Sequence, residues 1–264
     1  MFYILFIFLI GICVGSFLNV LVFRTHEQKS LVRSRSKCQK CEMAIAWYDL
    51  VPVLSFFLLR QRCRHCKSAI SWQYPLVELA TGLLFVLVFL FHFDALTGVF
   101  PATDTLPAII PFLVRDLIFS IFLIVLFVYD FKYQLLLDRF TIPAMVVALL
   151  INLFLGVSIW SMLMGAIMIG GFFFVQWFLS KGKWIGDGDI RMGTLMGLML
   201  GLTQGLVALF LAYILGAAVG VVLLVSKKAR MKTQIPFGTF LAVATFVALL
   251  WGEQILQWYL GMFI

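Results

Sequence analysis

Charge is scarce in this sequence. Only 12% of its 264 residues are Asp, Glu, Lys or Arg, about half the share of a typical soluble domain, whereas 63% are apolar. So few charges exclude an ordinary water-soluble fold for most of the chain. Apolar runs of about 20 residues recur instead, and each is long enough to cross the roughly 30 Å hydrocarbon core of a bilayer. The sequence therefore predicts a polytopic membrane protein.

The alternation of apolar and polar residues that marks the strands of a membrane barrel is also missing. In lipid every backbone amide must find its hydrogen bond within the protein, so the spans are predicted to be helices. We expect an all-α protein, and its predicted spans are about eight: residues 1–23, 75–93, 107–130, 141–157, 158–180, 190–204, 205–226 and 238–260. The apolar stretch 140–179 can be divided in more than one place.

Acidic residues number only 12 against 20 Lys and Arg, which gives a formal net charge of +8. The basic residues gather in loops that share one side of the membrane: Arg24–Lys67, Lys132–Arg139, Lys181–Arg191 and Lys227–Lys232. Arg115 is the exception, and the opposite side carries acidic residues: Asp94, Asp104, Asp116 and Glu253. Because positive loops stay in the cytoplasm, this pattern predicts a retained first span with its N-terminus outside, and no nucleic-acid partner.

Cysteine is rare as well, and four of the five cysteines lie in the one long polar segment, residues 25–74. They form two C-x-x-C pairs: Cys38, Cys41, Cys63 and Cys66. Pairs separated by 21 residues suit four thiolates around one zinc ion, and the surrounding Lys and Arg favour thiolates in a reducing cytoplasm. Four cysteines leave no open coordination position, so this zinc is predicted to be structural. Two redox-active C-x-x-C motifs are the alternative.

Two carboxylates stand at the ends of predicted spans. Asp130 ends the third span, and Asp189 closes the run Gly186–Asp189 before the sixth. Charged side chains in a membrane are costly and tend to be functional. Two carboxyl groups held close in a partly dry site share a proton, and the ionised one can activate water to hydrolyse a peptide bond. Structural roles stay open, since Asp189 could cap a helix and Asp130 could pair with Lys132 or Arg139.

Glycines recur at four-residue spacing in the sixth predicted span, at Gly193, Gly197 and Gly201. Small residues on one face let membrane helices approach closely. We expect this stripe to bring Asp189 towards Asp130.

Motifs along nearly the whole chain resemble those of bacterial type IV prepilin peptidases, which belong to the GxGD intramembrane aspartyl proteases. In order, they are GSFLNV (Gly15–Val20), the paired C-x-x-C motifs, YPLVELATG (Tyr74–Gly82), GDGD (Gly186–Asp189) and IPFG (Ile235–Gly238). The resemblance implies an enzyme at the cytoplasmic face of the bacterial inner membrane. Such an enzyme cleaves the leader from prepilins and pseudopilins of type IV pili and type II secretion. It then methylates the new N-terminus with S-adenosylmethionine.

The resemblance also implies that Asp130 and Asp189 are the two catalytic residues. The family's first aspartate ends a span about eight residues before a second acidic residue, which fits Asp130 followed by Asp138. Two nearby positions depart from the family pattern. Leu137 stands where proline is common, and Arg191 stands where lysine is frequent.

Methylation requires a cofactor site, and the chain has no glycine-rich strand-to-helix turn of a soluble nucleotide fold. Asn19, Arg24 and Glu78 are candidates for binding S-adenosylmethionine, because they are polar and lie near the cytoplasmic surface. Hydrogen bonding between helices and membrane topology account for the same three residues equally simply.

The expected organisation has three parts: a first span at 1–24, a four-cysteine zinc domain at 25–74 and a protease domain at 75–264. Three alternatives to the bifunctional enzyme remain. One is a peptidase without methyl transfer, and another is a transporter that uses its carboxylates as a proton relay. The third is a scaffold with zinc knuckles for docking.

Overall fold

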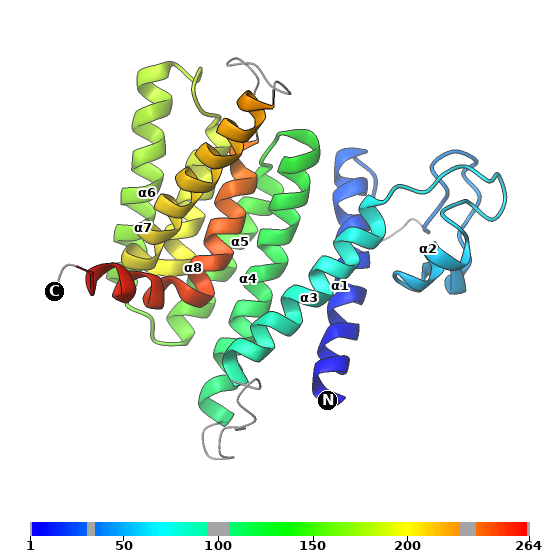
Figure 1. The fold of residues 1–264 in the computed structure, drawn as a ribbon, viewed down its shortest axis with the longest axis horizontal. Coiled ribbons are helices and arrows are strands. Elements are labelled where there is room, and N and C mark those ends of the chain that lie inside the picture. The colour runs from blue at the N-terminus through cyan, green and yellow to red at the C-terminus, as the bar shows by residue number, and fades with distance from the viewer. Residues whose placement is uncertain (1, 31–34, 94–105, 227–235, 263–264) are drawn as a thin grey trace. The chain divides into compact units, whose positions relative to one another are not determined.

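A computed structural model describes residues 2–30, 35–93, 106–226 and 236–262 (Figure 1). Four positions or segments used above lie outside the described residues: Asp94, Asp104, Lys227–Lys232 and Ile235. The helices are α1 (Phe2–His26), η1 (Trp47–Leu50), α2 (Leu54–Leu58), α3 (Gln73–Phe93), α4 (Leu106–Tyr133), α5 (Asp138–Phe154), α6 (Ile159–Ser180), α7 (Asp187–Val225) and α8 (Phe237–Leu260). Within the described ranges, extended pairing is limited to two isolated bridges, so the all-α prediction is confirmed.

Six of the described helices are long and apolar enough to cross a membrane: α1, α3, α4 from Ile109, α6, α7 and α8. Helix α5 has 17 residues, which is the short end of the spanning range. Helix α7 has 39 residues but breaks at Gly201, where φ is 73° and ψ is −170°. A Cβ atom on Gly205 would lie 3.9 Å from the Cα atom of Gly197, so the chain folds back on itself (Figure 1).

The two arms of α7 correspond to the predicted spans 190–204 and 205–226, with the turn at Gly201. Counting both arms together with α5, the described residues agree with the prediction of about eight membrane helices. The chain is therefore a multi-pass membrane protein.

The break in α7 frees backbone groups that lipid cannot satisfy. The Asn152 side chain of α5 donates hydrogen bonds to the carbonyl oxygens of Leu198, at 2.9 Å, and Met199, at 3.1 Å. On the other side of the break, the amide of Leu202 donates to Oγ of Ser161 in α6, at 3.2 Å. Two neighbouring helices therefore supply the polar partners that let the chain turn inside the second unit.

The glycine stripe is a packing surface, as predicted, but it does not pack on the helix that carries Asp130. Gly197 packs against the backbone of Ala166 and Gly193 against the ring of Phe173, both of which belong to α6. The stripe therefore joins α7 to α6 rather than to the helix that carries Asp130. The core of residues 102–264 lies among α4, α6, α7 and α8. Its largest fully buried side chains include Phe119, Leu126, Ile169, Phe173, Met192, Met196 and Leu241.

The contacts divide the chain into two compact units, residues 1–101 and 102–264. In the first unit α1 packs along α3 through glycines. A Cβ atom on Gly11 would lie 2.7 Å from the Cα atom of Gly82, and one on Gly15 would lie 2.8 Å from that of Glu78. The structure thus groups the helix at 75–93 with the first span. The functional division into 1–24, 25–74 and 75–264 stays a prediction.

Residues 35–72, which we call the cysteine lobe, contain an internal repeat. The pattern C-x-x-C-x-x-A-I-x-W occurs at Cys38–Trp47 and again, 25 positions later, at Cys63–Trp72. Each copy forms the same turn. An isolated bridge joins Lys37 to Ala44 in the first copy and Arg62 to Ala69 in the second. Each turn also holds a residue at positive φ, Glu42 at 55° and Lys67 at 57°.

Candidate active site

Asp130 lies in the last turn of α4 and is only 5% exposed. Its Oδ2 atom accepts a 2.8 Å hydrogen bond from the main-chain amide of Thr239, in the first turn of α8. That turn begins at Pro236, which is the N-cap of α8. A Cβ atom at Gly238 would lie 2.8 Å from Oδ2 of Asp130, so only glycine lets the two helices approach this closely. The described part of the IPFG motif, Pro236–Gly238, therefore begins the helix turn that packs against Asp130.

Asp189 lies in the first turn of α7 and is 8% exposed. The N-cap of this helix is Gly186, and Asp189 stands three positions later. Its Oδ2 atom accepts a 3.1 Å hydrogen bond from the amide of Gly186, which is one half of a capping box; glycine has no side chain to form the other half. The structure thus gives Asp189 a capping contact without making it the N-cap, and the carboxyl group stays buried.

The structure brings Asp130 and Asp189 together in the second unit. Their carboxyl groups lie near enough for the two charges to interact. Leu136 packs against α7, which carries Asp189, and against the first turn of α8, which binds Asp130. A Cβ atom on Gly188 would lie 2.8 Å from Cβ of Leu136, and one on Gly238 would lie 2.9 Å from its Cδ1 atom. The partner of Asp130 among the described residues is Thr239, and neither Lys132 nor Arg139 pairs with it.

The other two aspartates of these motifs are exposed. The side chains of Asp138 and Asp187 are 60% and 70% accessible, and Arg191 forms ion pairs with both. Arg191 therefore joins the first turn of α5 to the first turn of α7, beside Asp189. The extra negative charge at Asp187 is compensated by this guanidinium. Asp138 is in contact with solvent, whereas Asp130 is buried.

The three cofactor candidates lie in the first unit. Asn19, which is buried, donates through Nδ2 to the carbonyl oxygen of Tyr74 at 3.1 Å. Glu78, also buried, accepts a 2.7 Å hydrogen bond from the amide of Val53. Arg24 is half-buried in the last turn of α1. The contacts of Asn19 and Glu78 hold α1, α3 and the cysteine lobe together, so both residues have a structural role.

The four predicted zinc ligands converge at one point. The sulfur atoms of Cys38, Cys41, Cys63 and Cys66 all lie within 4.8 Å of one another, and those of Cys38 and Cys66 are 3.8 Å apart. Four sulfurs at the usual zinc distance would be about 3.8 Å apart in a tetrahedron. Hydrogen bonds from the amides of Cys41 and Lys40 lower the pKa of the Cys38 thiol to about 6. Against an amide hydrogen bond from Met43, burial and the neighbouring sulfurs raise the pKa of the Cys41 thiol to about 11. The donor set and its spacing fit a structural zinc ion.

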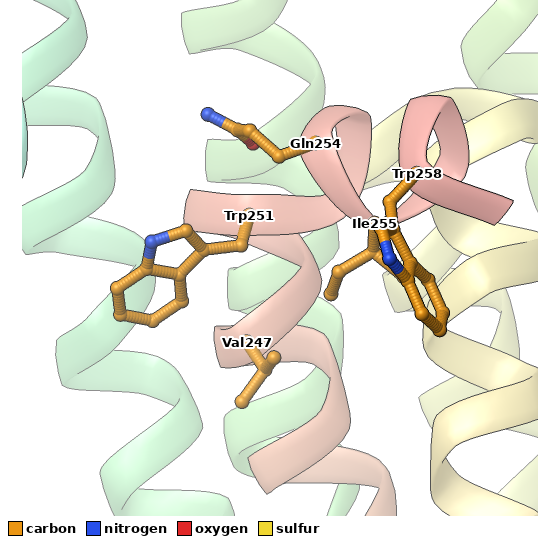
Figure 2. A pocket seen from close by; sticks show the side chains of 5 residues that line it. All are labelled: Val247, Trp251, Gln254, Ile255 and Trp258. Atoms are coloured by element: carbon orange, nitrogen blue, oxygen red, sulfur yellow. The ribbon is translucent and has the colours of Figure 1, made fainter. Parts of the chain in front are cut away.

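Two surface hollows among the described residues lie away from the aspartates. One, of about 360 Å³, is at the C-terminal end of α8, and Figure 2 shows the indoles of Trp251 and Trp258 on either side of Ile255 there. Another, of about 380 Å³, runs between α4 and α5. Neither is lined by Asp130 or Asp189, and apolar side chains dominate both, as expected of surfaces that face lipid.

Sequence reasoning missed one buried charge pair. It assigned Arg115 and Asp116 to the outer side without pairing them; in the structure both lie inside α4, and Asp116 is buried. Nε of Arg115 donates to Oδ1 of Asp116 at 2.7 Å, and the guanidinium also lies over the ring of Phe112. Both residues lie within the predicted span 107–130. A basic and an acidic residue at adjacent positions inside an apolar span could have indicated the pair.

Comparisons with known proteins agree with the motifs. Residues 9–92 match the bacterial peptidase A24 N-terminal domain, and residues 117–221 match the type IV leader peptidase family. The prepilin leader peptidase/N-methyltransferase of Aeromonas salmonicida is 31% identical over an alignment of 285 positions. The alignment covers 97% of this chain and 93% of the relative. That of Pseudomonas putida is 32% identical over 276 residues, covering 93% and 90%.

The relative of the same name from Myxococcus xanthus is 34% identical over 228 residues, covering 84% of this chain but 63% of the relative. No solved structure matches the chain. This chain is more than 30% identical to the Aeromonas and Pseudomonas proteins over nearly their full length. The two domain matches and the order of the motifs agree with that similarity. The chain belongs to the type IV leader peptidase family.

Proposed function

We propose that this protein cleaves the leader peptide from type IV prepilins and pseudopilins and then methylates the new N-terminus. The observation that carries the proposal is the pair of buried, neighbouring carboxyl groups of Asp130 and Asp189. Leader cleavage and methylation are both in the names of the relatives from Aeromonas and Pseudomonas. Neither a transporter nor a scaffold accounts for a carboxyl pair combined with these motifs.

The proposed chemistry is hydrolysis of one peptide bond by a carboxyl pair that shares a proton. The ionised carboxyl group takes a proton from water, whose oxygen attacks the scissile carbonyl carbon, while the other carboxyl group protonates the carbonyl oxygen. Collapse of this intermediate breaks the C–N bond, and the nitrogen leaves with a proton from the dyad. Hydrogen bonds hold Oδ2 of both Asp130 and Asp189, so the proposal assigns Oδ1 of each to water and substrate.

The position of the pair suits a prepilin, which has a basic leader followed by an apolar helix. Asp130 lies at the end of the membrane-length helix α4, and Asp189 lies at the start of the first arm of α7, so the scissile bond would be cut near the membrane surface. In the proposed orientation this end faces the cytoplasm, because Lys132, Arg139 and Lys181 lie in adjoining loops or helix ends. The protein would then reside in the bacterial inner membrane.

The proposed cofactors are a structural zinc ion and S-adenosylmethionine. Cys38, Cys41, Cys63 and Cys66 would hold the zinc, which would stabilise the fold of the cysteine lobe. S-adenosylmethionine would supply the methyl group for the new amine. Asn19, Arg24 and Glu78 stay the candidate residues for its site, although hydrogen bonds already engage the side chains of Asn19 and Glu78.

The test is mass spectrometry of a prepilin incubated with the purified full-length protein, with and without S-adenosylmethionine. We expect loss of the leader in both reactions, and one further methyl group on the new N-terminus only with the methyl donor. An uncleaved prepilin, under conditions in which a relative cleaves it, would overturn the proposal. Cleavage that is never followed by methylation would leave a peptidase alone.

A further inference from the structure

The cysteine lobe exposes an apolar surface that the proposed chemistry does not use. Its members are large side chains from η1, α2 and the end of the second cysteine repeat: Trp47, Leu50, Leu54, Phe57, Leu58 and Trp72. Trp47 is 81% exposed and Leu58 73% exposed. We call these six residues the apolar patch. The rings of Phe57 and Trp72 lie 6.5 Å apart. Exposed apolar side chains that gather on one small lobe mark a site of interaction with a protein or a membrane.

The lobe is built to hold this patch outwards. Phe56 is buried, and its ring packs against that of Trp72 with centroids 5.0 Å apart. The next residue along α2, Phe57, is half exposed. Val53, which precedes α2, has φ of 60°, a costly conformation for a β-branched residue that persists only when its surroundings impose it. Phe56 thus anchors α2 to the lobe, while Phe57 and Leu58 point away from it.

A hydrogen bond sets the depth of α2 relative to the membrane helices of the same unit. The amide of Val53 donates to Oε2 of Glu78 at 2.7 Å. Glu78 is the sixth residue of α3, so its Cα atom lies roughly 7 Å inside the start of that membrane-length helix. In Figure 1, α2 lies level with the middle of α1 rather than beyond its C-terminal end. The apolar patch thus begins at the depth at which helix surfaces meet lipid.

The charge on the lobe complements a bilayer surface. Residues 35–72 contain seven Lys and Arg against two acidic residues, and one of the two, Asp49, is paired with Arg64. The guanidinium of Arg64 also lies over the ring of Tyr48, with 5.2 Å between the carbon and the ring centroid. Exposed Trp and Tyr beside basic residues are typical of the interface between headgroups and acyl chains.

From these contacts we propose that the cysteine lobe is a membrane-inserted module whose partner is the lipid leaflet on its own side. The apolar patch lies among the acyl chains, and the basic residues of the lobe lie among anionic headgroups. The two tethers of the lobe, the end of α1 and the start of α3, are themselves the ends of membrane-length helices, so insertion continues their lipid-facing surface. The lobe would then be a platform in the membrane surface rather than a domain free in solution.

Photocrosslinking of the full-length protein in lipid nanodiscs that contain phosphatidylglycerol tests the proposal. The photoreactive residue p-benzoylphenylalanine replaces Leu58 or Phe57 in the patch. Glu42, an exposed residue of the same lobe outside the patch, is the matched control position. After illumination, mass spectrometry of the intact protein measures the lipid adduct. We expect on the order of tenfold more adduct at the two patch positions than at Glu42, since acyl chains surround a side chain inserted to this depth.

Equal adduct at patch and control positions, in variants that retain their metal, would overturn the proposal. So would a label at Leu58 that attaches mainly to residues 106–262 of the same chain, because the second unit would then cover the patch. A third result that overturns it is attachment mainly to an added prepilin, which would make the patch a substrate surface. Loss of lipid adduct at Leu58 in the Glu78→Leu variant, whose side chain has no acceptor for the amide of Val53, would support the role of this bond.

Discussion

The main-chain amide of Thr239 donates a 2.8 Å hydrogen bond to Oδ2 of Asp130, and the two residues are 109 positions apart in the chain. The first turn of α8 therefore fixes one oxygen of a carboxyl group that belongs to the end of α4. This contact explains why a motif near the C-terminal end accompanies an aspartate in the middle of the sequence. It also makes the backbone of Gly238 part of the surroundings of Asp130.

The first prediction concerns Gly238→Ala. The new methyl group would lie 2.8 Å from Oδ2 of Asp130 and 2.9 Å from Cδ1 of Leu136, so the carboxyl group has to move. A displacement of about 1 Å in a catalytic group can cost roughly a hundredfold in rate, and we expect a loss of that order in kcat/KM for prepilin cleavage. The matched control is Gly171→Ala on α6, where no atom lies within 4 Å of the new methyl group. Wild-type cleavage by Gly238→Ala would contradict the assigned geometry.

The second prediction concerns Arg191, whose guanidinium pairs with Asp138 and Asp187. Arg191→Gln removes this link between the first turns of α5 and α7. Because partly exposed ion pairs contribute only about 1 kcal/mol, we expect a fall of roughly fivefold in kcat/KM. Arg191→Lys keeps the charge and is expected to recover most of the activity. Equal losses in the Gln and Lys variants would show that the charge is not what matters.

The third prediction concerns the metal. Cys63→Ser is expected to lose the zinc, and with it a stabilisation on the order of 10 kcal/mol for the lobe. Cys13→Ser, which changes a cysteine in α1 outside the cluster, is expected to retain one zinc per chain. Elemental analysis of the purified variants distinguishes the two outcomes. Equal zinc in both variants would contradict a four-cysteine site.

Zinc retention is also expected to depend on pH. Only the thiolate binds the metal, and the pKa of Cys38 is lowered to about 6 by amide hydrogen bonds. A lowered pKa keeps the ligand ionised at neutral pH, and the ionised form is lost as the pH falls through that value. We therefore expect zinc to stay bound at neutral pH and to be released below about pH 6, as followed by a colorimetric zinc indicator. Release that rises with increasing pH would have the wrong sign.

The fourth prediction concerns Asn152, which satisfies two carbonyl groups at the break in α7. Asn152→Leu leaves those carbonyls without their donor inside the membrane. We expect a loss of about 1–2 kcal/mol in stability, measured as a lower Tm in detergent. Thr203→Leu, at an exposed position just after the break, is the control and should leave Tm nearly unchanged. An unchanged Tm for Asn152→Leu would mean that the carbonyls find other partners.

Much of the membrane architecture follows from the sequence, because lipid imposes apolar helices of a fixed length. Helices α1, α3, α6 and α8 begin and end within a few residues of their predicted spans. A turn in α7 was also predicted, between residues 204 and 205, but its place at Gly201 was not. The stripe of glycines has the spacing of a packing surface, and nothing in that spacing distinguishes Gly201, which takes a positive φ, from its neighbours. Only the donors from α5 and α6 show why the chain turns there.

The site was predictable as a set of residues but not as an arrangement. Motifs selected Asp130 and Asp189, and the structure brings their carboxyl groups together. The contact between Asp130 and Thr239 depends on how α8 packs on α4, which no local pattern encodes. The short helix α2 was not predicted, since five apolar residues inside a polar segment carry no periodicity. The repeat C-x-x-C-x-x-A-I-x-W can be read from the sequence, and it would have predicted the same turn at both cysteine pairs.

The central claim is that Asp130 and Asp189 form a catalytic pair, and substitution by asparagine tests it most directly. Asn keeps an oxygen that can accept the hydrogen bonds from Thr239 and Gly186, while it removes the ionisable group. Leader cleavage by Asp130→Asn and Asp189→Asn should each fall by about a thousandfold or more, as expected when a general acid or base is lost. Both variants should still methylate a pilin whose leader has already been removed. Cleavage at the wild-type rate by either variant would contradict the account.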